Sequence, residues 1–280
     1  MNNIKPGTRI PLEGTINTRD LGGYQTKDGR TIRYGRLIRT DCLSHITDKD
    51  IRYLTDILHA RYEVDMRGYD EIQREPDRTI PGVTFLHMPI QEELNKGYEM
   101  NPHTNFDVED KDIKGTIDYL FRMDKNGDMS HSFEKVYRDM LKPFGAKHYE
   151  EFLRLCMKNK EGAILFHCAD GKDRSGLAAA ILLLTLGVDR ETVIQDYLRT
   201  NENTKAKAEY REHYLRDICH IRDEIVISSI KMVAGVRRNW LEAALDEMEK
   251  QAGSIDDFIL EKLHFTKEDQ KKLQDNYLEQ

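Results

Sequence analysis

Short runs of alternating apolar and polar residues characterise the first part of the chain. Residues 24–40 alternate in this way around Asp28 and Gly29, a pair typical of tight turns, which predicts a β-hairpin. The runs YEVDMR (62–67) and VTFLHMP (83–89) predict two further strands, with prolines in the loop between them. We therefore expect short strands to dominate this part of the fold.

The segment between the hairpin and these two strands has the spacing of a helix. Thr47 and Asp50 stand as in a capping box, directly before apolar residues at positions 51, 54, 57 and 58. A helix between buried strands is typical of a βαβ arrangement. The sequence therefore predicts an α/β fold with a central, mostly parallel sheet flanked by helices.

Helical patterns dominate the second half of the chain. Helices are predicted at 131–142, 146–159, 175–187 and 190–201, and over almost all residues from 203 to the end. No linker rich in Pro, Gly or Ser interrupts the chain, so we expect one domain over residues 1–280. Within it, the polar stretch 91–130 is predicted to be a variable insertion or lid, and 203–280 a helical C-terminal portion.

Composition narrows the class of protein. With 39% hydrophobic residues, 33% charged residues and a net charge of −7, the sequence is typical of a soluble globular protein, and its acidic balance argues against nucleic acid as the main partner. The longest apolar run, 177–186, is shorter than the roughly 20 residues of a membrane span. Because no secretory signal is evident, we expect a cytoplasmic protein, with signal-independent secretion as the alternative. The four cysteines form no C-x-x-C pair, which argues against a zinc site or a disulfide framework.

The stretch HCADGKDRSG (167–176) is the main candidate for chemistry. It lies between an apolar run predicted to be a buried strand, 163–166, and an apolar helix predicted over 175–186. Such a loop directs its backbone N–H groups and the positive end of the helix dipole toward one point at the carboxyl edge of the sheet. The sequence therefore predicts an anion site.

Cysteine and arginine in this loop have the spacing of a nucleophile and a phosphate clamp. Cys168 begins the loop, where a helix N-terminus favours the thiolate. Arg174 follows six residues later, and its guanidinium can bind two phosphate oxygens at once. Gly171 and Gly176 allow a tight turn and a close approach. A buried cysteine before a capped helix is the alternative, but all these parts together favour an active site.

This loop matches the motif H-C-x5-R-[ST] and so resembles the signature loop of the cysteine-dependent protein tyrosine phosphatase superfamily. Four further segments resemble its atypical bacterial tyrosine/serine and lipid phosphatase branch. They are NTRDLGGY (17–24), VDMRGYDEIQREPD (64–77), which contains a D-x-R-x-x-x-E pattern, GVDRETVIQDYLRTN (187–201) and SIDDFILEKLHFTKEDQKKLQDNYLE (254–279). The resemblance implies a tyrosine-phosphatase-like fold. It also implies hydrolysis of phosphomonoesters through a cysteinyl-phosphate, with no metal or other cofactor.

The leaving oxygen of a phosphate ester needs a proton from a general acid. The Trp-Pro-Asp motif of ordinary tyrosine phosphatases is absent, since the sole tryptophan, Trp240, is followed by Leu-Glu. The resemblance instead implies an aspartate inside the loop, and Asp173 stands there. Asp65 is the alternative acid, unless it only forms an ion pair with Arg67 or caps the end of its strand.

The resemblance also implies roles for neighbouring residues. Phosphate is expected to contact the loop residues Ala169, Asp170, Gly171, Lys172, Arg174 and Ser175. Lys172 is expected to be a second cation for the substrate, with a solvated loop lysine as the alternative. Ser175 is expected to cap the helix and to assist the departing thiolate, and His167 to order the loop by hydrogen bonding. Arg19 and Asp20 either support the loop from behind or brace the N-terminal strands.

Asp170 departs from the branch, which usually has a small residue here. The carboxylates of Asp170 and Asp173 balance Lys172 and Arg174. This balance disfavours multiply phosphorylated lipids relative to simple monoesters.

We therefore predict a phosphatase acting first on phosphotyrosine in proteins or peptides, with phosphoserine, phosphothreonine and phosphoinositides as further substrates. A phosphoinositide, lipid or small-molecule phosphatase is the closest alternative. A phosphate-binding pseudophosphatase and a rhodanese-like sulfurtransferase are alternatives of other classes, but a pseudoenzyme commonly loses the Cys or the Arg. A sulfurtransferase would not require Arg174, Lys172 or the acid within the loop.

Overall fold

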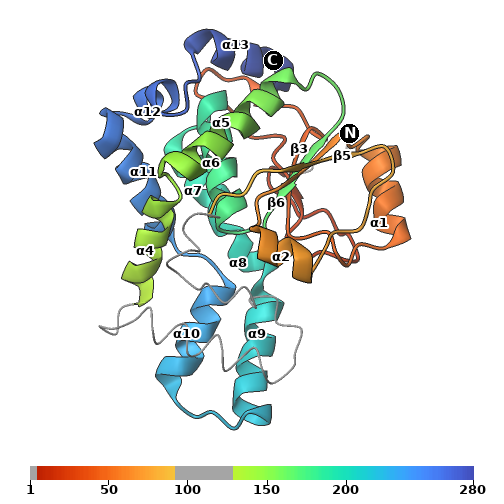
Figure 1. The fold of residues 1–280 in the computed structure, drawn as a ribbon, viewed down its shortest axis with the longest axis vertical. Helices are drawn as coiled ribbons and strands as arrows, with labels where there is room; N and C mark the ends of the chain where they lie inside the picture. The colour runs from red at the N-terminus through yellow and green to blue at the C-terminus, as the bar shows by residue number, and fades with distance from the viewer. Residues whose placement is uncertain (1–4, 92–128) are drawn as a thin grey trace.

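The computed structural model describes residues 5–91 and 129–280, and most of the predicted insertion or lid at 91–130 lies outside these ranges. A five-stranded sheet with the order β1-β3-β6-β4-β5 forms the centre (Figure 1). Its strands are β1 (Arg19–Asp20), β3 (Leu37–Thr40), β6 (Ile164–His167), β4 (Tyr62–Asp65) and β5 (Thr84–His87). Only β1 runs antiparallel to its neighbour, which confirms the predicted mostly parallel sheet.

Helices cover both faces of this sheet because its central strand is apolar on both sides. In β6, Ile164 and Phe166 join the larger core cluster, whereas Leu165 joins a second cluster on the opposite face. The second cluster includes residues that follow α1 (Asp48–Arg52), in particular Leu54 in the π-helical turn η1 (Tyr53–Ile57). Strand β6 is therefore the buried middle of a three-layer arrangement.

The helix after the candidate loop is α6 (Arg174–Leu186), and every residue in it except Leu184 is buried. It packs among α5 (Pro143–Lys158), α7 (Arg190–Leu198) and α13 (Lys267–Tyr277). The prediction of a helix apolar on nearly all sides is confirmed. Because its surroundings are packed, α6 holds the loop against β6 at a defined place.

The described chain contains eight further helical segments. They are α2 (Tyr69–Arg74), α4 (Met129–Asp139), α8 (Thr200–Asn203), α9 (Lys205–His213), η3 (Tyr214–Ile218), α10 (Glu224–Ala234), α11 (Arg238–Ala252) and α12 (Ile255–Glu261). Helices α9 and α10 lie side by side and project away from the sheet (Figure 1). They pack around a small apolar cluster of their own.

The last strand of the chain pairs with a strand of the N-terminal part in a second, two-stranded sheet. Strand β7 (Leu278–Glu279) pairs antiparallel with β2 (Thr31–Ile32), which follows the predicted turn at Gly29. The expectation of a helix up to the chain end is therefore wrong for these last residues. The largest core cluster spans both ends, since it contains Leu21 and Leu278.

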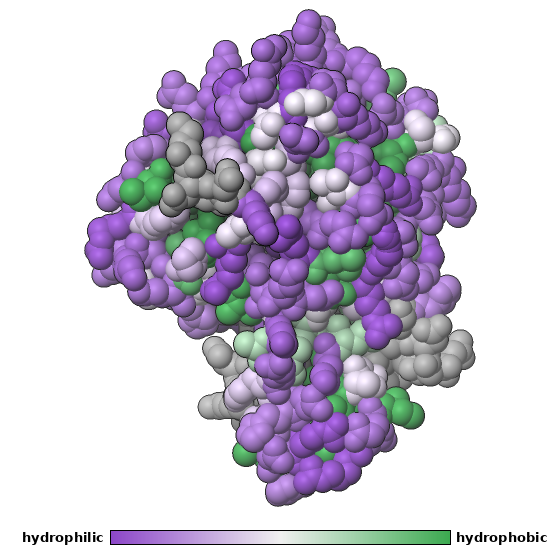
Figure 2. All heavy atoms as spheres, turned by 180° about the vertical axis from the view of Figure 1, so that it is seen from behind, coloured by the Kyte–Doolittle hydropathy of each residue, from purple (hydrophilic) through white to green (hydrophobic). Residues whose placement is uncertain are grey.

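The outer surface is largely polar. Figure 2 shows a mostly hydrophilic back face with scattered apolar groups. Within residues 5–91 and 129–280, no helix combines the length and the apolar character that crossing a membrane requires.

Candidate active site

The predicted loop joins the carboxyl end of β6 to the start of α6, as expected. Cys168 follows β6 directly and is 2% exposed. Its Sγ lies 3.5 Å from Oγ of Ser175. Ser175 is not the helix cap that we predicted, because α6 begins one residue earlier, at Arg174, with Asp173 at the cap position. The Ser175 hydroxyl lies beside the Cys168 thiol.

The carbonyl groups of the loop are bound from behind. The backbone N–H of Cys42 donates to the Ala169 carbonyl at 3.0 Å, and Nδ2 of Asn17 donates to the carbonyls of Asp170 at 3.1 Å and Gly171 at 2.9 Å. Arg39 donates from Nε to the Gly171 carbonyl at 2.9 Å and from Nη2 to the Lys172 carbonyl at 3.0 Å.

These anchors determine where the N–H groups of the loop point. In a trans peptide the N–H lies opposite the carbonyl of the preceding residue. With the carbonyls of residues 169–172 bound behind the loop, the N–H groups of residues 170–173 are directed to its other side. This is the arrangement of N–H groups that the predicted anion site requires.

Arg39 and Asn17 are supports of the candidate loop that sequence reasoning missed. Both are 0% exposed. Arg19 supports the loop only indirectly, since its Nη1 donates to Oδ1 of Asn17 at 3.1 Å and its Nε pairs with Asp196 at 3.1 Å. Asp20 accepts from the backbone N–H groups of residues 22 and 35, so it braces the N-terminal strands. Of the two roles predicted for this pair, support of the loop applies to Arg19 and bracing of the N-terminal strands applies to Asp20.

A single carboxylate compensates the buried arginines behind the loop. Asp196 pairs with Arg19 and lies 3.5 Å from Nη1 of Arg39. Burial opposes ionisation, but these two guanidinium groups hold the pKa of the Asp196 carboxyl below its usual range. The residue lies in the 187–201 segment that carries the family resemblance, and that location is the only sequence signal for it.

Arg174 is held by Glu71 from α2. Its Nη2 donates to Oε1 of Glu71 at 2.7 Å, and its Nη1 donates to Oε2. Such a two-point contact fixes the plane of the guanidinium. Glu71 also accepts from the Gly68 N–H at 2.9 Å, which secures it at the start of α2. Glu71 is the last residue of the D-x-R-x-x-x-E pattern, a signal that sequence reasoning quoted without assigning a role.

Asp173 lies at the mouth of the loop, with a side chain that is 23% exposed. Its Oδ1 accepts from the Tyr137 hydroxyl at 2.7 Å, and that hydroxyl lies 2.5 Å from the hydroxyl of Tyr197. Oδ2 lies 3.4 Å from Nζ of Lys172. One carboxylate oxygen is thus fixed by a buried tyrosine pair.

Lys172 is buried at 4% exposure, so the alternative of a solvated loop lysine is wrong. Its Nζ donates to the Val233 carbonyl at 2.5 Å and to the Gly235 carbonyl at 3.5 Å, at the end of α10. Asp170 also points toward the helical arm, where it accepts from Lys207 in α9. Two loop residues thereby contact α9 and α10.

Asp65 lies beneath the loop in a charged cluster and is 0% exposed. It accepts from Nη2 of Arg67 at 2.8 Å, and the same nitrogen donates to Asp77 at 2.5 Å. Burial opposes ionisation, but His167 and Arg67 together lower the pKa of Asp65 to about 2. Asp65 therefore forms the ion pair with Arg67 that its structural alternative describes.

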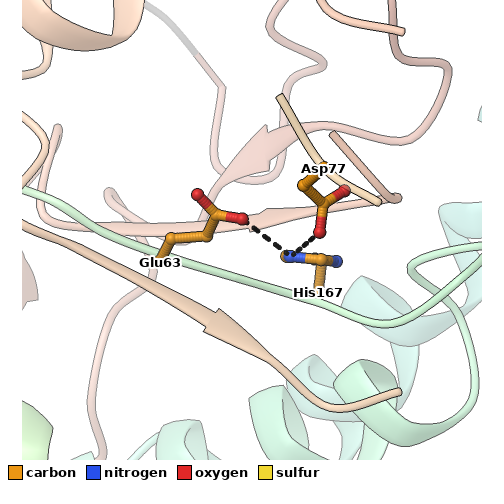
Figure 3. Close-up of side chains that lie close together, drawn as sticks. All are labelled: Glu63, Asp77 and His167. Carbon is orange, nitrogen blue, oxygen red and sulfur yellow. Dashed lines mark ion pairs between the residues drawn. The ribbon is translucent and has the colours of Figure 1, made fainter. Parts of the chain in front are cut away.

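His167 belongs to the same cluster (Figure 3). Its Nδ1 lies 3.1 Å from the Cys168 carbonyl, and its Nε2 lies 3.7 Å from Oε1 of Glu63 and 3.5 Å from Oδ2 of Asp77. Burial lowers the pKa of His167, but Asp65 and Asp77 raise it to about 10. The ring is thus protonated at neutral pH and orders the loop instead of acting as a base.

Glu63, Asp77 and His167 converge closely enough to flank a cation. However, Arg67 already donates to the same oxygen of Asp77, and the protonated imidazole places a second positive charge between the carboxylates. The geometry favours an ion-pair cluster over a metal site.

We predict that Gly171→Ala destabilises the protein more than another left-handed glycine does. Gly171 has φ +63°, and an added Cβ would lie 2.4 Å from the Thr40 carbonyl oxygen. We expect the free energy of unfolding, measured by urea denaturation, to fall by about 2–4 kcal/mol. Gly29→Ala is the control, because Gly29 has φ +86° with nothing within 4 Å, and should cost about 1–2 kcal/mol. Equal losses would contradict the tight fit of the loop.

Comparison with known proteins identifies the family. A family model described as the tyrosine phosphatase family matches residues 10–279. The chain belongs to this family. A protein of Cupriavidus necator that is grouped by name with the tyrosine-protein phosphatases is 26% identical over 271 residues, covering 96% of this chain and 88% of its own length.

Two further relatives carry related names. The triple specificity protein phosphatase PtpB of Mycobacterium tuberculosis is 23% identical over 275 residues, which cover 89% of this chain and 91% of PtpB. A tyrosine-protein phosphatase of Nostoc commune is 26% identical over 163 residues, covering 57% of this chain and 46% of its own. Membership of the tyrosine phosphatase family and these names support a protein tyrosine phosphatase activity. They also confirm the family resemblance and the fold class expected from the sequence.

Proposed function

We propose that the protein hydrolyses phosphomonoesters, first of all phosphotyrosine in proteins or peptides, through a cysteinyl-phosphate intermediate. One observation carries this proposal: Cys168 and Arg174 flank a loop in which the carbonyls of residues 169–172 are bound from behind. The N–H groups and the guanidinium can then bind the equatorial oxygens of one phosphate. The whole chain, 1–280, would act as a single catalytic domain, in line with a core cluster that contains Leu21 and Leu278.

In the first step, the Cys168 thiolate forms a bond to phosphorus as the bond between phosphorus and the ester oxygen breaks. Asp173 gives its proton to that oxygen, which leaves as an alcohol or phenol. In the second step, Asp173 accepts a proton from water as the water oxygen attacks phosphorus. The S–P bond then breaks, and the Ser175 hydroxyl, 3.5 Å from Sγ, donates to the departing thiolate. No step calls for a metal or cofactor.

The substrate range is a separate part of the proposal. Phosphoserine, phosphothreonine and phosphoinositides follow phosphotyrosine as candidates, and the name of the Mycobacterium relative, which indicates three specificities, supports testing them. The rival proposal of a phosphate-binding pseudophosphatase is weakened because both Cys168 and Arg174 are present.

A substrate panel tests the proposed function. A phosphotyrosine peptide, a phosphoserine peptide, a sugar phosphate and a short-chain phosphoinositide would be incubated with the protein in EDTA, and phosphate release measured. We expect the highest kcat/KM for the phosphotyrosine peptide. Hydrolysis of none of the four, or activity that depends on added metal, would contradict the proposal.

We expect Tyr137→Phe to lower kcat for an alkyl phosphate by roughly tenfold, since the loss of one hydrogen bond to the Asp173 carboxylate releases its orientation. Steady-state kinetics with phosphoserine measure the effect. Tyr277→Phe is the matched control, because it removes another buried hydroxyl, one that donates to the Cys156 carbonyl in α5. A similar fall in both variants would show that the loss is one of general stability.

A further inference from the structure

Three cations surround the carboxylate of Asp170, which is 7% exposed. Nζ of Lys207 donates to its Oδ1 at 2.6 Å, and Nζ of Lys172 lies 4.0 Å from its Oδ2. Arg211, one helical turn after Lys207 in α9, is 2% exposed and also interacts electrostatically with Asp170. One carboxylate thus joins two cations of α9 to a cation of the phosphate loop.

We infer that Asp170 is a specificity-determining residue that fills a subsite for a second phosphate beside the scissile one. Lysine and arginine bind carboxylate and phosphate through the same charge-assisted contacts. The two oxygens of Asp170 face Lys207 and Lys172 as two oxygens of a phosphate would. This inference rests on the proposed function only in taking the loop as the site of the scissile phosphate.

The position of this cation group defines the class of ligand. Asp170 and Lys172 belong to the same short loop as Cys168 and Arg174, so a phosphate replacing the carboxylate would lie close to the one held by the loop. A ligand that carries two phosphates on neighbouring atoms of one ring, such as an inositol bisphosphate, is the class that would present both phosphates to one short loop. The Lys207 side chain is 20% exposed, which leaves that edge of the subsite open to solvent.

In the native protein, Asp170 works against such a ligand. Burial opposes ionisation, but Lys207 and Lys172 together with Arg211 lower the pKa of Asp170 to about 2. Its negative charge is therefore present at neutral pH, and a second phosphate would have to replace it or lie against it. Substrates with one isolated phosphate meet no such opposition. The protein is thus built to prefer them.

The test compares binding of inositol 4-phosphate and inositol 4,5-bisphosphate by titration calorimetry at fixed ionic strength. All proteins carry Cys168→Ser, so that no ligand is consumed. Adding Asp170→Ala should raise the preference for the bisphosphate, as a ratio of dissociation constants, by at least about tenfold. Asp170→Asn should give a smaller rise, because it removes the charge but keeps the volume. Adding Lys207→Gln to Asp170→Ala should reverse most of the gain.

Glu212→Gln is the matched control, because Glu212 is another carboxylate of α9 and pairs with Lys231 at 2.5 Å and Arg216 at 3.0 Å. It should leave the binding ratio unchanged. An unchanged ratio of dissociation constants in both Asp170 variants, or no bisphosphate binding by either, would overturn the inference. Asp170 would then only connect the loop to α9 through its ion pair with Lys207. The proposed function is judged separately, by hydrolysis of the phosphotyrosine peptide by protein with the native loop. If the ratio of dissociation constants changed but the protein with the native loop hydrolysed no phosphotyrosine peptide, the subsite would be supported and the proposed phosphatase activity contradicted.

Discussion

Cys168→Ser is expected to abolish hydrolysis of an aryl phosphate while the protein still binds phosphate and vanadate. A serine hydroxyl without a nearby base is a poor nucleophile at neutral pH, so turnover should fall by at least about 10⁴-fold. The anion site should survive, since its shape depends on contacts from Asn17 and Arg39 to the loop carbonyls. Release of the phenol measures turnover, and calorimetry measures oxyanion binding.

Cys219→Ser provides the control, because Cys219 is a half-buried cysteine after η3, outside the phosphate loop. It should keep near-native turnover. Substantial hydrolysis by the Cys168 variant would reject the covalent mechanism. Loss of both turnover and phosphate binding would indicate that the loop had collapsed, and Cys168→Ala would then separate the nucleophile from the fold.

Asp173→Asn is expected to slow hydrolysis of an alkyl phosphate far more than that of an aryl phosphate with an acidic phenol. An alkoxide leaves poorly without a proton, whereas an acidic phenolate needs little help. We expect a penalty of about 10²–10⁴ on the alkyl ester and a flatter basic limb of the pH–rate profile. The carboxylate lies at the loop mouth, one residue before Arg174, with a partly exposed side chain.

Asp65→Asn tests the rival acid. Asp65 is fully buried and paired with Arg67, so its loss should lower the rates of both esters by similar factors through a displaced loop. Strand β4 does adjoin β6, with Asp65 opposite His167, so the position alone does not exclude this residue. If Asp65→Asn produced the leaving-group dependence and Asp173→Asn did not, the two roles would be reversed.

The parts of the site that sequence predicted are those with local signals. Cys168, Gly171 and Arg174 stand within one loop, and the apolar runs on either side predict a strand and a helix by their composition alone. The central position of β6 followed from its apolar residues. The structure places each of these elements within a residue or two of the expectation.

The supports of the site could not be predicted because they come from distant parts of the chain. Arg39 in the short strand LIRT has no local mark of burial, and its charge is compensated by Asp196, far along the sequence. Glu71 reaches Arg174 only because α2 and α6 begin at the same edge of the sheet. The contact of Lys172 with the end of α10 depends on tertiary packing alone.

The bound carbonyls of the phosphate loop have a thermodynamic consequence. Because residues 169–172 are held by the scaffold and not by a ligand, the cradle exists in the free protein. Under the proposed function, binding of an oxyanion would therefore cost little conformational entropy of the backbone, and we expect even a small inorganic anion to bind. Discrimination between substrates then depends on the side chains that surround this preorganised loop.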